Sequence, residues 1–175
     1  VDPSADNMLK ITNEARLLGL DARCIVQNAE NYPDSKVNLC IDKIMEIYDR
    51  TSAEKGVQAI FCDIAVNSDD GKFSVYDYLK QELAQRGIPE NEICTAGDAA
   101  TQKQRNEMYA QLRSGTKRIV LASTSKMGTG ANIQTKLAAL HNLDIPWKPS
   151  DVEHTKRNKG RPIIRQIMQI KETLP

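Results

Sequence analysis

Two kinds of hydrophobic pattern divide the chain near residue 54. Before that point, apolar residues recur at spacings of three and four, which predicts amphipathic helices. The first predicted helix is marked by Met8, Ile11, Ala15 and Leu18. A polar loop over residues 28–35 follows, and a second helix is marked by Val37, Ile41, Ile44 and Tyr48. Either Asp34 or Ser35 is expected to cap this second helix at its N-terminus.

From Gly56 onward the pattern changes to short apolar runs that alternate with helical periodicity. Runs of strand length occupy residues 57–62, 92–96, 118–122 and 138–143, and helical patterns occupy 73–87 and 101–114. Gly87 and Gly115 are expected to end these two helices. Steps of this length predict βαβ units in a parallel sheet that is covered on both faces. We therefore predict an α/β, doubly wound domain over residues 55–175, preceded by a helical segment over residues 1–54.

Composition and charge narrow the classes of function only a little. The 175 residues are 40% hydrophobic and 27% charged, which is ordinary for a folded domain. Lys and Arg number 24 against 23 acidic residues, so any basic patch must be local. The four cysteines form no CxxC pair, which argues against a zinc site and favours buried, reduced thiols. With no signal peptide and no membrane-spanning stretch, a cytoplasmic location is expected. A start at Val1 suggests a segment of a larger protein.

The loop after the run 118–122 is the best candidate for phosphate chemistry. Gly128 and Gly130 allow close backbone approach to a phosphate, and the residues that follow could open a helix whose N-terminus favours anions. Lys126, Asn132, Gln134 and several hydroxyls add donors. A tight turn without a ligand is the alternative interpretation. The Walker A pattern GxxxxGK followed by Ser or Thr is absent, which excludes a self-sufficient P-loop NTPase.

Two further features follow the run 138–143. Trp147 stands between Pro146 and Pro149 in a rigid turn, and it could equally plug the edge of the sheet. From Lys148 to Glu172, seven basic residues face three acidic ones, which indicates either a solvated surface or an anion site. Upstream, Asp63 at the end of its strand is expected to cap a loop rather than to act in chemistry.

In this order, the motifs resemble the C-terminal domain of superfamily-2 helicases, especially the Swi/Snf-like branch. The resemblance spans residues 58–166 and is closest to the helicase segments of phage- and plasmid-borne helicase–DNA methylase proteins. Residues 59–63 look like the first strand of that domain, and residues 95–98 with the Gln104-Arg105 helix look like the next conserved segment. Residues 123–134 resemble motif V, residues 143–149 the Leu-Asp…Pro-Trp…Pro turn, and residues 160–166 the remains of motif VI.

This resemblance implies a RecA-like fold and one half of a motor that binds ATP and Mg between two such domains. The missing N-terminal RecA-like domain would hold most of the ATP and Mg, so this chain is not expected to hydrolyse ATP alone and holds no metal of its own. DNA and that domain would be partners, possibly with a linked methylase and no membrane. Motif V residues near the nucleotide would be Gly128, Thr129, Gly130, Asn132 and Gln134. DNA contacts would fall to Ser123, Thr124, Lys126, Lys156 and Arg157. Arg161 and Arg165 would be the catalytic arginines.

Motif VI departs from the family form QRxGRxxR. The Gln before Arg157 is missing, an extra residue precedes Gly160, and Pro162 widens the gap between Arg161 and Arg165. Pro162 also disfavours a helix there. A second hypothesis is therefore a catalytically inactive module that keeps the helicase fold for binding. A third is a flavodoxin-like domain that binds a small phosphorylated ligand through Gly128 and Gly130.

Overall fold

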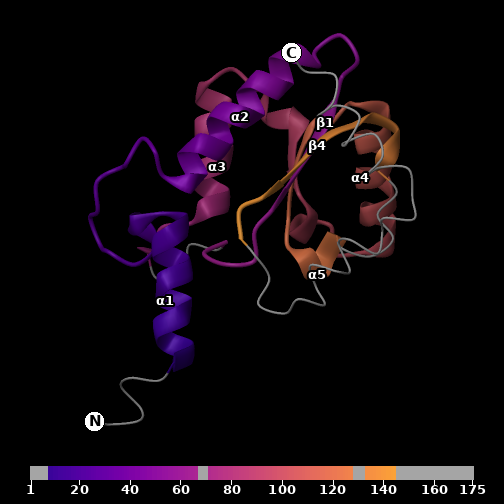
Figure 1. Cartoon of the computed structure of the whole chain (residues 1–175). Coiled ribbons are helices and arrows are strands. Elements are labelled where there is room, and N and C mark those ends of the chain that lie inside the picture. The colour runs from indigo at the N-terminus through magenta and orange to yellow at the C-terminus, as the bar shows by residue number, and fades with distance from the viewer. Residues whose placement is uncertain (1–7, 67–70, 128–132, 145–175) are drawn as a thin grey trace, which may run out of the picture.

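The computed structural model describes residues 8–66, 71–127 and 133–144, which form a parallel sheet with helices on both faces (Figure 1). The strands are β1 (Val57–Phe61), β2 (Ile93–Thr95), β3 (Ile119–Ala122) and β4 (Leu137–Asn142), in the order β2-β3-β1-β4. This arrangement confirms the predicted α/β class. Each predicted strand is present, and each boundary lies within one residue of its expected place.

β1 lies inside the sheet, between β3 and β4, and both of these neighbours come later in the chain. Gln58 pairs with Ile119 of β3 on one side and with Ala139 of β4 on the other, and both pairings are parallel. Val57, Ala59 and Ile60 of β1 are completely buried. A near-continuous apolar strand is what a parallel sheet with both faces covered requires.

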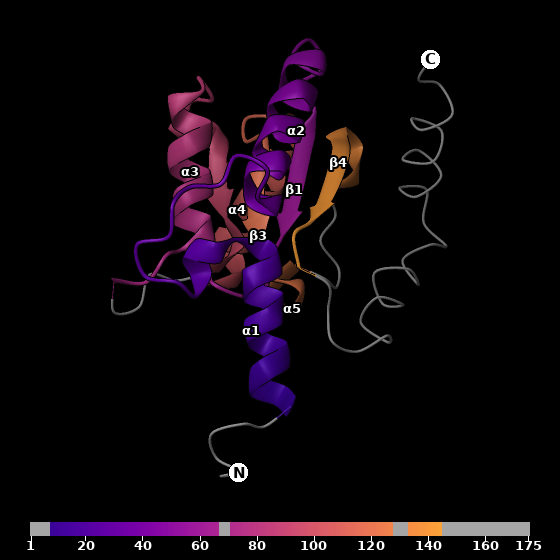
Figure 2. The ribbon, with the colours of Figure 1, turned by 60° about the vertical axis from the view of Figure 1, so that its left-hand side comes forward.

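Two helices cover each face of the sheet. α2 (Lys36–Arg50) and α3 (Val75–Gln85) pack on one face, around Ile44, Ile60 and Leu79. α4 (Gln102–Ser114) and the short α5 (Thr124–Met127) pack on the other, with Met108 and Met127 in that core. Figures 1 and 2 show the two layers from different sides. α2 thus shares a core with the strands, while the predicted division of the chain at residue 54 stays a prediction.

Local sequence sets the ends of these helices. The Ser35 and Ser74 side chains accept hydrogen bonds from the backbone N–H groups of residues 38 and 77, and so cap α2 and α3. At the start of α4, Thr101 and Gln104 bond each other's backbone in a capping box. Gly115 ends α4 with a φ of 77°, a left-handed conformation that glycine adopts without strain.

α1 (Met8–Leu20) is helical as predicted, but its apolar stripe does not reach a core. Met8, Ile11 and Leu18 are 77%, 52% and 56% exposed, and Leu20 is the one buried residue of the helix. The helix extends away from the body (Figure 2). Periodicity specifies a helix but not a surface that covers its apolar side.

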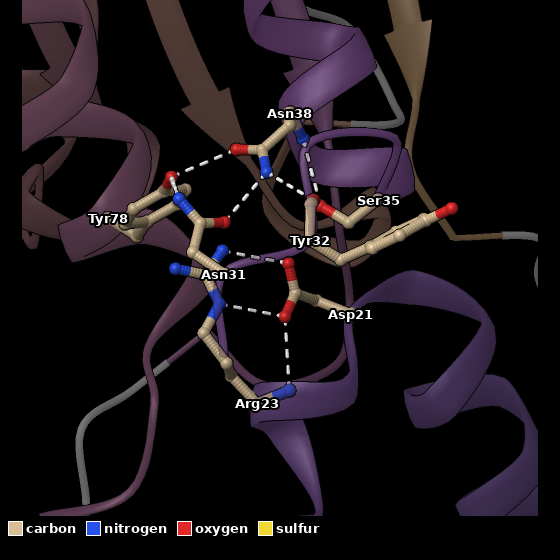
Figure 3. Close-up of polar contacts among 7 residues, drawn as sticks. All are labelled: Asp21, Arg23, Asn31, Tyr32, Ser35, Asn38 and Tyr78. Carbon is tan, nitrogen blue, oxygen red and sulfur yellow. Dashed lines mark hydrogen bonds and ion pairs between the residues drawn. The ribbon is translucent and has the colours of Figure 1, made fainter. Parts of the chain in front are cut away.

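Polar contacts join the segment between α1 and α2 to its neighbours (Figure 3). It includes the short 3₁₀ helix η1 (Ala22–Cys24). Arg23 bonds both carboxylate oxygens of Asp21 at 2.8 Å. Its guanidinium also lies 4.1 Å from the ring centroid of Tyr78 on α3. Asn38 of α2 donates to the Asn31 side chain at 2.8 Å and accepts from the Tyr78 hydroxyl at 2.9 Å. These bonds join the polar loop to both α2 and α3.

Arg118 is a buried cation where β3 begins, with 4% of its surface exposed. Its Nη2 donates to the Tyr48 carbonyl at 2.7 Å and to Thr51 Oγ1 at 3.3 Å, and its Nε donates to the Gly56 carbonyl at 3.2 Å. The guanidinium also stacks 3.7 Å from the Tyr48 ring centroid. A single side chain thereby ties the C-terminal end of α2 to the amino ends of β1 and β3.

A second buried polar group links β4, β1 and α2. Gln58 is fully buried, and its Nε2 donates to the Ile44 carbonyl at 2.9 Å. Its Oε1 therefore faces His141 Nε2, also at 2.9 Å, and can only accept. Burial and, to a lesser extent, the charge of Lys43 lower the pKa of His141 to about 4, so the imidazole is neutral with its proton on Nε2.

The four cysteines are free and in no disulfide. Cys62 is buried and the other three are partly buried, close to the sequence expectation. Burial raises the pKa of Cys40 and Cys62 to about 12, which keeps both thiols protonated and unreactive at neutral pH. None of the helices that the structure describes is long and apolar enough to cross a membrane.

Candidate functional site

The carboxyl ends of β1 and β3 form the most favourable ligand position in this sheet. The two strands are neighbours, and Phe61 lies beside Ala122 where both end. The chain leaves β1 toward α3 on one face, whereas it leaves β3 through α5, which packs in the core of the other face. Diverging connections open a crevice at such a switch point, which is where open α/β sheets bind their ligands.

Asp63 and Thr124 are bonded to each other at this edge of the sheet. The Asp63 carboxylate accepts from the Thr124 backbone N–H at 2.7 Å and from the Thr124 hydroxyl at 2.6 Å. Asp63 therefore caps the turn that begins α5, which confirms its predicted role. Bonds to both carboxylate oxygens fix the orientation of Thr124 relative to β1, although both residues are accessible to solvent.

α5 places several polar groups beside this contact. Met127 is buried under the sheet and anchors the turn, while Ser125 and Lys126 are exposed. The Ser123 and Ser125 hydroxyls lie 3.1 Å apart. The structure therefore brings together Ser123, Thr124 and Lys126, the three described residues that were predicted to contact DNA.

The Lys126 ammonium lies over the loop that follows β2. A β-carbon at Gly97, in the 3₁₀ helix η4 (Ala96–Asp98), would lie 3.3 Å from Lys126 Nζ. Glycine at this position leaves room for the lysine side chain to rest on the backbone. One ammonium group and three hydroxyls thus lie near the carboxyl ends of β1, β2 and β3, and the Lys126 and Ser125 groups are of a kind that suits a phosphate.

Gln134, which was predicted to lie near the nucleotide, is placed elsewhere. It starts the 3₁₀ helix η5 (Gln134–Lys136), directly before β4. β4 begins beside Val57, at the amino end of β1, and Lys136 donates to the Glu54 carbonyl at 2.8 Å. Gln134 therefore lies toward the end of the sheet opposite to Thr124. The described structure does not bring these two predicted site residues together.

The remaining predicted site residues lie outside the described ranges. These are Gly128, Thr129, Gly130 and Asn132 of the glycine loop, and Lys156, Arg157, Arg161 and Arg165 of the basic segment. The Trp147 turn lies outside them as well.

An ion pair that sequence reasoning missed stands at the end of β4. Arg16 Nη2 of α1 lies 2.7 and 2.6 Å from the two carboxylate oxygens of Asp144. The Asp144 side chain is 4% exposed, so the pair is largely shielded from water. The two residues are far apart in the chain, and only the position of Asp144 at a strand end could have indicated a role. The pair fixes α1 at the same edge of the sheet as Thr124.

Metal-ligating side chains do not form a cluster within the described residues. Within residues 8–66, 71–127 and 133–144, no three His, Cys, Asp or Glu side chains are placed to hold a metal ion.

Comparison with known protein families matches residues 40–162 to the family described as the helicase conserved C-terminal domain. The match begins within α2 and includes all four strands and the whole edge with Asp63, Thr124 and Lys126. A comparison with curated proteins gave no match.

Proposed function

Because the chain belongs to the helicase conserved C-terminal domain family, we propose that it is the second motor domain of an ATP-dependent DNA translocase of superfamily 2. The observation that carries the proposal is the group formed by Thr124, Asp63 and Lys126 at the carboxyl edge of the sheet. We assign the domain to the Swi/Snf-like branch on the resemblance of its motif V and Trp147 turn.

Thr124 and Lys126 are proposed to hold the DNA backbone. The Thr124 hydroxyl donates its proton to Asp63, so its oxygen can only accept, from a water that bridges to a phosphate. The neighbouring Ser125 hydroxyl remains to donate to a phosphate directly. Lys126 supplies the charge and releases counterions on binding. Because Asp63 is fixed to β1, a phosphate bound by this turn would move with the sheet as a rigid body.

The nucleotide is proposed to lie between this domain and an N-terminal RecA-like domain. ATP with Mg supplies the phosphoryl group whose transfer drives domain movement, and the N-terminal domain would hold most of it. Gly128, Thr129, Gly130 and Asn132 are proposed to line the near side of that cleft, whereas Gln134 is left out because it lies toward the opposite end of the sheet. Arg161 and Arg165 are proposed to stabilise the growing negative charge of the transition state, a task that suits a guanidinium because it stays charged.

The DNA proposal is tested by fluorescence anisotropy with a labelled duplex of about 20 base pairs, titrated at several salt concentrations. Lys126→Ala should make the negative slope of log affinity against log salt shallower by about 0.9, the change expected for one lost phosphate contact. Thr124→Val should weaken binding without changing the slope. Arg50→Ala removes an exposed cation from α2 and is the matched control, expected to bind as the unmodified chain does. Equal slopes for Lys126→Ala and Arg50→Ala would contradict the proposal.

The ATPase part of the proposal is tested in the full-length protein. The reading frame around this chain should encode a Walker A loop upstream, and Arg161→Ala and Arg165→Ala should each abolish DNA-stimulated ATP hydrolysis. If hydrolysis is unchanged in both variants, the domain is the alternative, a helicase-fold binding module with a degenerate motif VI. Lys156 and Arg157 are proposed as further DNA contacts. The resemblance to phage- and plasmid-borne proteins also leads us to propose a methylase in the same polypeptide, which sequencing of that frame would reveal.

A further inference from the structure

One side of α1 is apolar and exposed to solvent. It is formed by Met8, Ile11, Ala15 and Leu18, all four of which are exposed, and we call this set the α1 seam. Among the described residues, four of the eight exposed large apolar side chains belong to this one helix. Such a concentration of exposed apolar surface marks a site of interaction. The site proposed for DNA does not use this side of α1.

The spacing within the α1 seam indicates what kind of partner covers it. Successive members are three, four and three residues apart, which is the spacing of a helix that packs along a second helix. Other sides of α1 are already in contact with the body, because Leu20 is buried and Arg16 is bonded to Asp144. The partner is therefore an amphipathic helix that lies on the outer side of α1.

A matching apolar seam occurs in the sequence near the end of the chain. Its members are four, three and four residues apart: Ile163, Ile167, Ile170 and Leu174. Pro162 stands where a first helical residue is favoured, and Pro175 follows the last member. This pattern predicts a helix over residues 162–174, which lie outside the described ranges. Both α1 and residues 163–174 also lie outside residues 40–162, so the matched family domain accounts for neither seam.

The path of the chain favours this segment as the partner. Asp144, the last described residue, is held by Arg16 in the second half of α1. The 18 residues from 145 to 162 can span at most about 60 Å, whereas the 13 residues of α1 are about 20 Å long. Every member of the α1 seam is therefore within reach. A tethered segment also has a local concentration on the order of millimolar, which a second copy in dilute solution does not reach.

We propose that residues 162–174 form an amphipathic helix that packs its apolar seam against the α1 seam. Arg165 lies two residues from both Ile163 and Ile167, which places it on the side of such a helix that faces away from α1. Docking would therefore leave its guanidinium available. Only this last consequence, that a docked segment can still present Arg165 to a nucleotide, rests on the proposed function.

Photo-crosslinking in the whole 175-residue chain tests which segment covers α1. Ala15→p-benzoylphenylalanine places the crosslinker in the α1 seam, and irradiation at micromolar protein is done without ATP or DNA. Mass spectrometry should find a crosslink within one molecule to residues 166–171, the peptide that trypsin releases between Arg165 and Lys171. Asn13→p-benzoylphenylalanine, at an exposed position outside the seam, is the control and should not give this crosslink. Crosslinked dimers in place of the intramolecular product would overturn the proposal and assign the seam to a second copy.

Hydrogen exchange of α1 provides a second readout. Ile170→Asp should speed amide exchange in residues 8–20 about tenfold or more, because the helix loses a buried apolar contact. Met168→Asp makes a similar change in the same segment but outside the seam, and should leave exchange of α1 as it was. Equal exchange in the two variants would overturn the proposal. Neither readout involves ATP or DNA, so the failure of this proposal is distinguishable from the failure of the proposed function.

Discussion

Replacing Arg118 by Met should destabilise the fold without affecting DNA binding at temperatures where the domain remains folded. The guanidinium makes three hydrogen bonds, to the Tyr48 and Gly56 carbonyls and to Thr51 Oγ1, and it stacks on Tyr48. Met replaces most of the buried apolar volume but none of these donors, so two buried carbonyls lose a partner. The change tests whether hydrogen bonds offset the cost of burying this charge.

The expected size of the effect follows from those contacts. Hydrogen bonds from a charged group contribute about 1.5–3 kcal/mol each, and a buried cation–π contact contributes up to about 2 kcal/mol. Relief of the desolvation cost of the cation offsets part of this sum. We expect a net loss of about 3 kcal/mol in the free energy of unfolding. For a domain of this size, that corresponds to a fall in Tm of about 10 °C.

Urea denaturation followed by circular dichroism measures the change, with the DNA titration repeated at low temperature. Arg118→Lys keeps the charge but not the rigid fork, and should lose about half as much stability. Arg50→Met, on the exposed surface of α2, should change stability by less than about 0.5 kcal/mol. Should Arg118→Met prove as stable as the unmodified chain, or more so, desolvation outweighs the hydrogen bonds and our reasoning is wrong.

Three further outcomes are expected. The pKa of His141 falls from 6.5 to about 4 on folding. As the pH is lowered, His141 therefore becomes protonated in the unfolded chain at a higher pH than in the folded chain. Stability should therefore be full above pH 6.5 and decrease as the pH falls toward 4, by at most about 3 kcal/mol, as urea denaturation at pH 7 and 4.5 would show. Asp144→Asn should loosen α1, seen as faster amide exchange over residues 8–20, because Arg16 loses its charged partner. Gly115→Ala should cost about 1–2 kcal/mol in thermal denaturation, since its φ is 77° and an added β-carbon would lie 2.7 Å from Lys55 Cβ.

Each of these outcomes has a matched control. His141→Gln keeps a donor for Gln58 and should remove the pH dependence between 6.5 and 4, so an unchanged dependence would contradict the assignment. Glu14→Gln, an exposed change on α1, should leave exchange of that helix as it was. Gly19→Ala, in α1, meets no atom within 4 Å and should not destabilise, in contrast to Gly115→Ala.

The sequence predicted the elements of this fold better than it predicted their contacts. Strand and helix assignments rest on local periodicity and capping, and Ser35, Thr101 and Gly115 act at the helix ends as their residue types suggest. The burial of α1 depends on a surface that its own sequence does not encode. That is why the stripe of Met8 and Ile11 predicts a helix but does not say that both residues are exposed.

In the candidate site, too, contacts between residues close in sequence were predictable and contacts between distant residues were not. Ser123, Thr124 and Lys126 are consecutive or nearly so, and a strand end brings them together without further information. Asp63 joins them because parallel neighbours end at one edge, a consequence of strand order that the alternation of elements only suggests. The Arg16–Asp144 pair joins residues that lie 128 positions apart in the chain, and hydrophobic periodicity does not indicate that they meet. Periodicity likewise does not indicate that Gln134 lies toward the end of the sheet opposite to Thr124.

The central place of β1 has a consequence for synthesis and folding. Gln58 finds its sheet partners only at positions 119 and 139, so a growing chain carries an apolar strand long before either neighbour exists. Non-local pairing of this kind slows folding and prolongs exposure of aggregation-prone segments. α2, which precedes β1 and shares its core, can cover one face of the strand as soon as both have been made. The helix before the sheet would thus act as an early folding partner that protects β1 until β3 and β4 arrive.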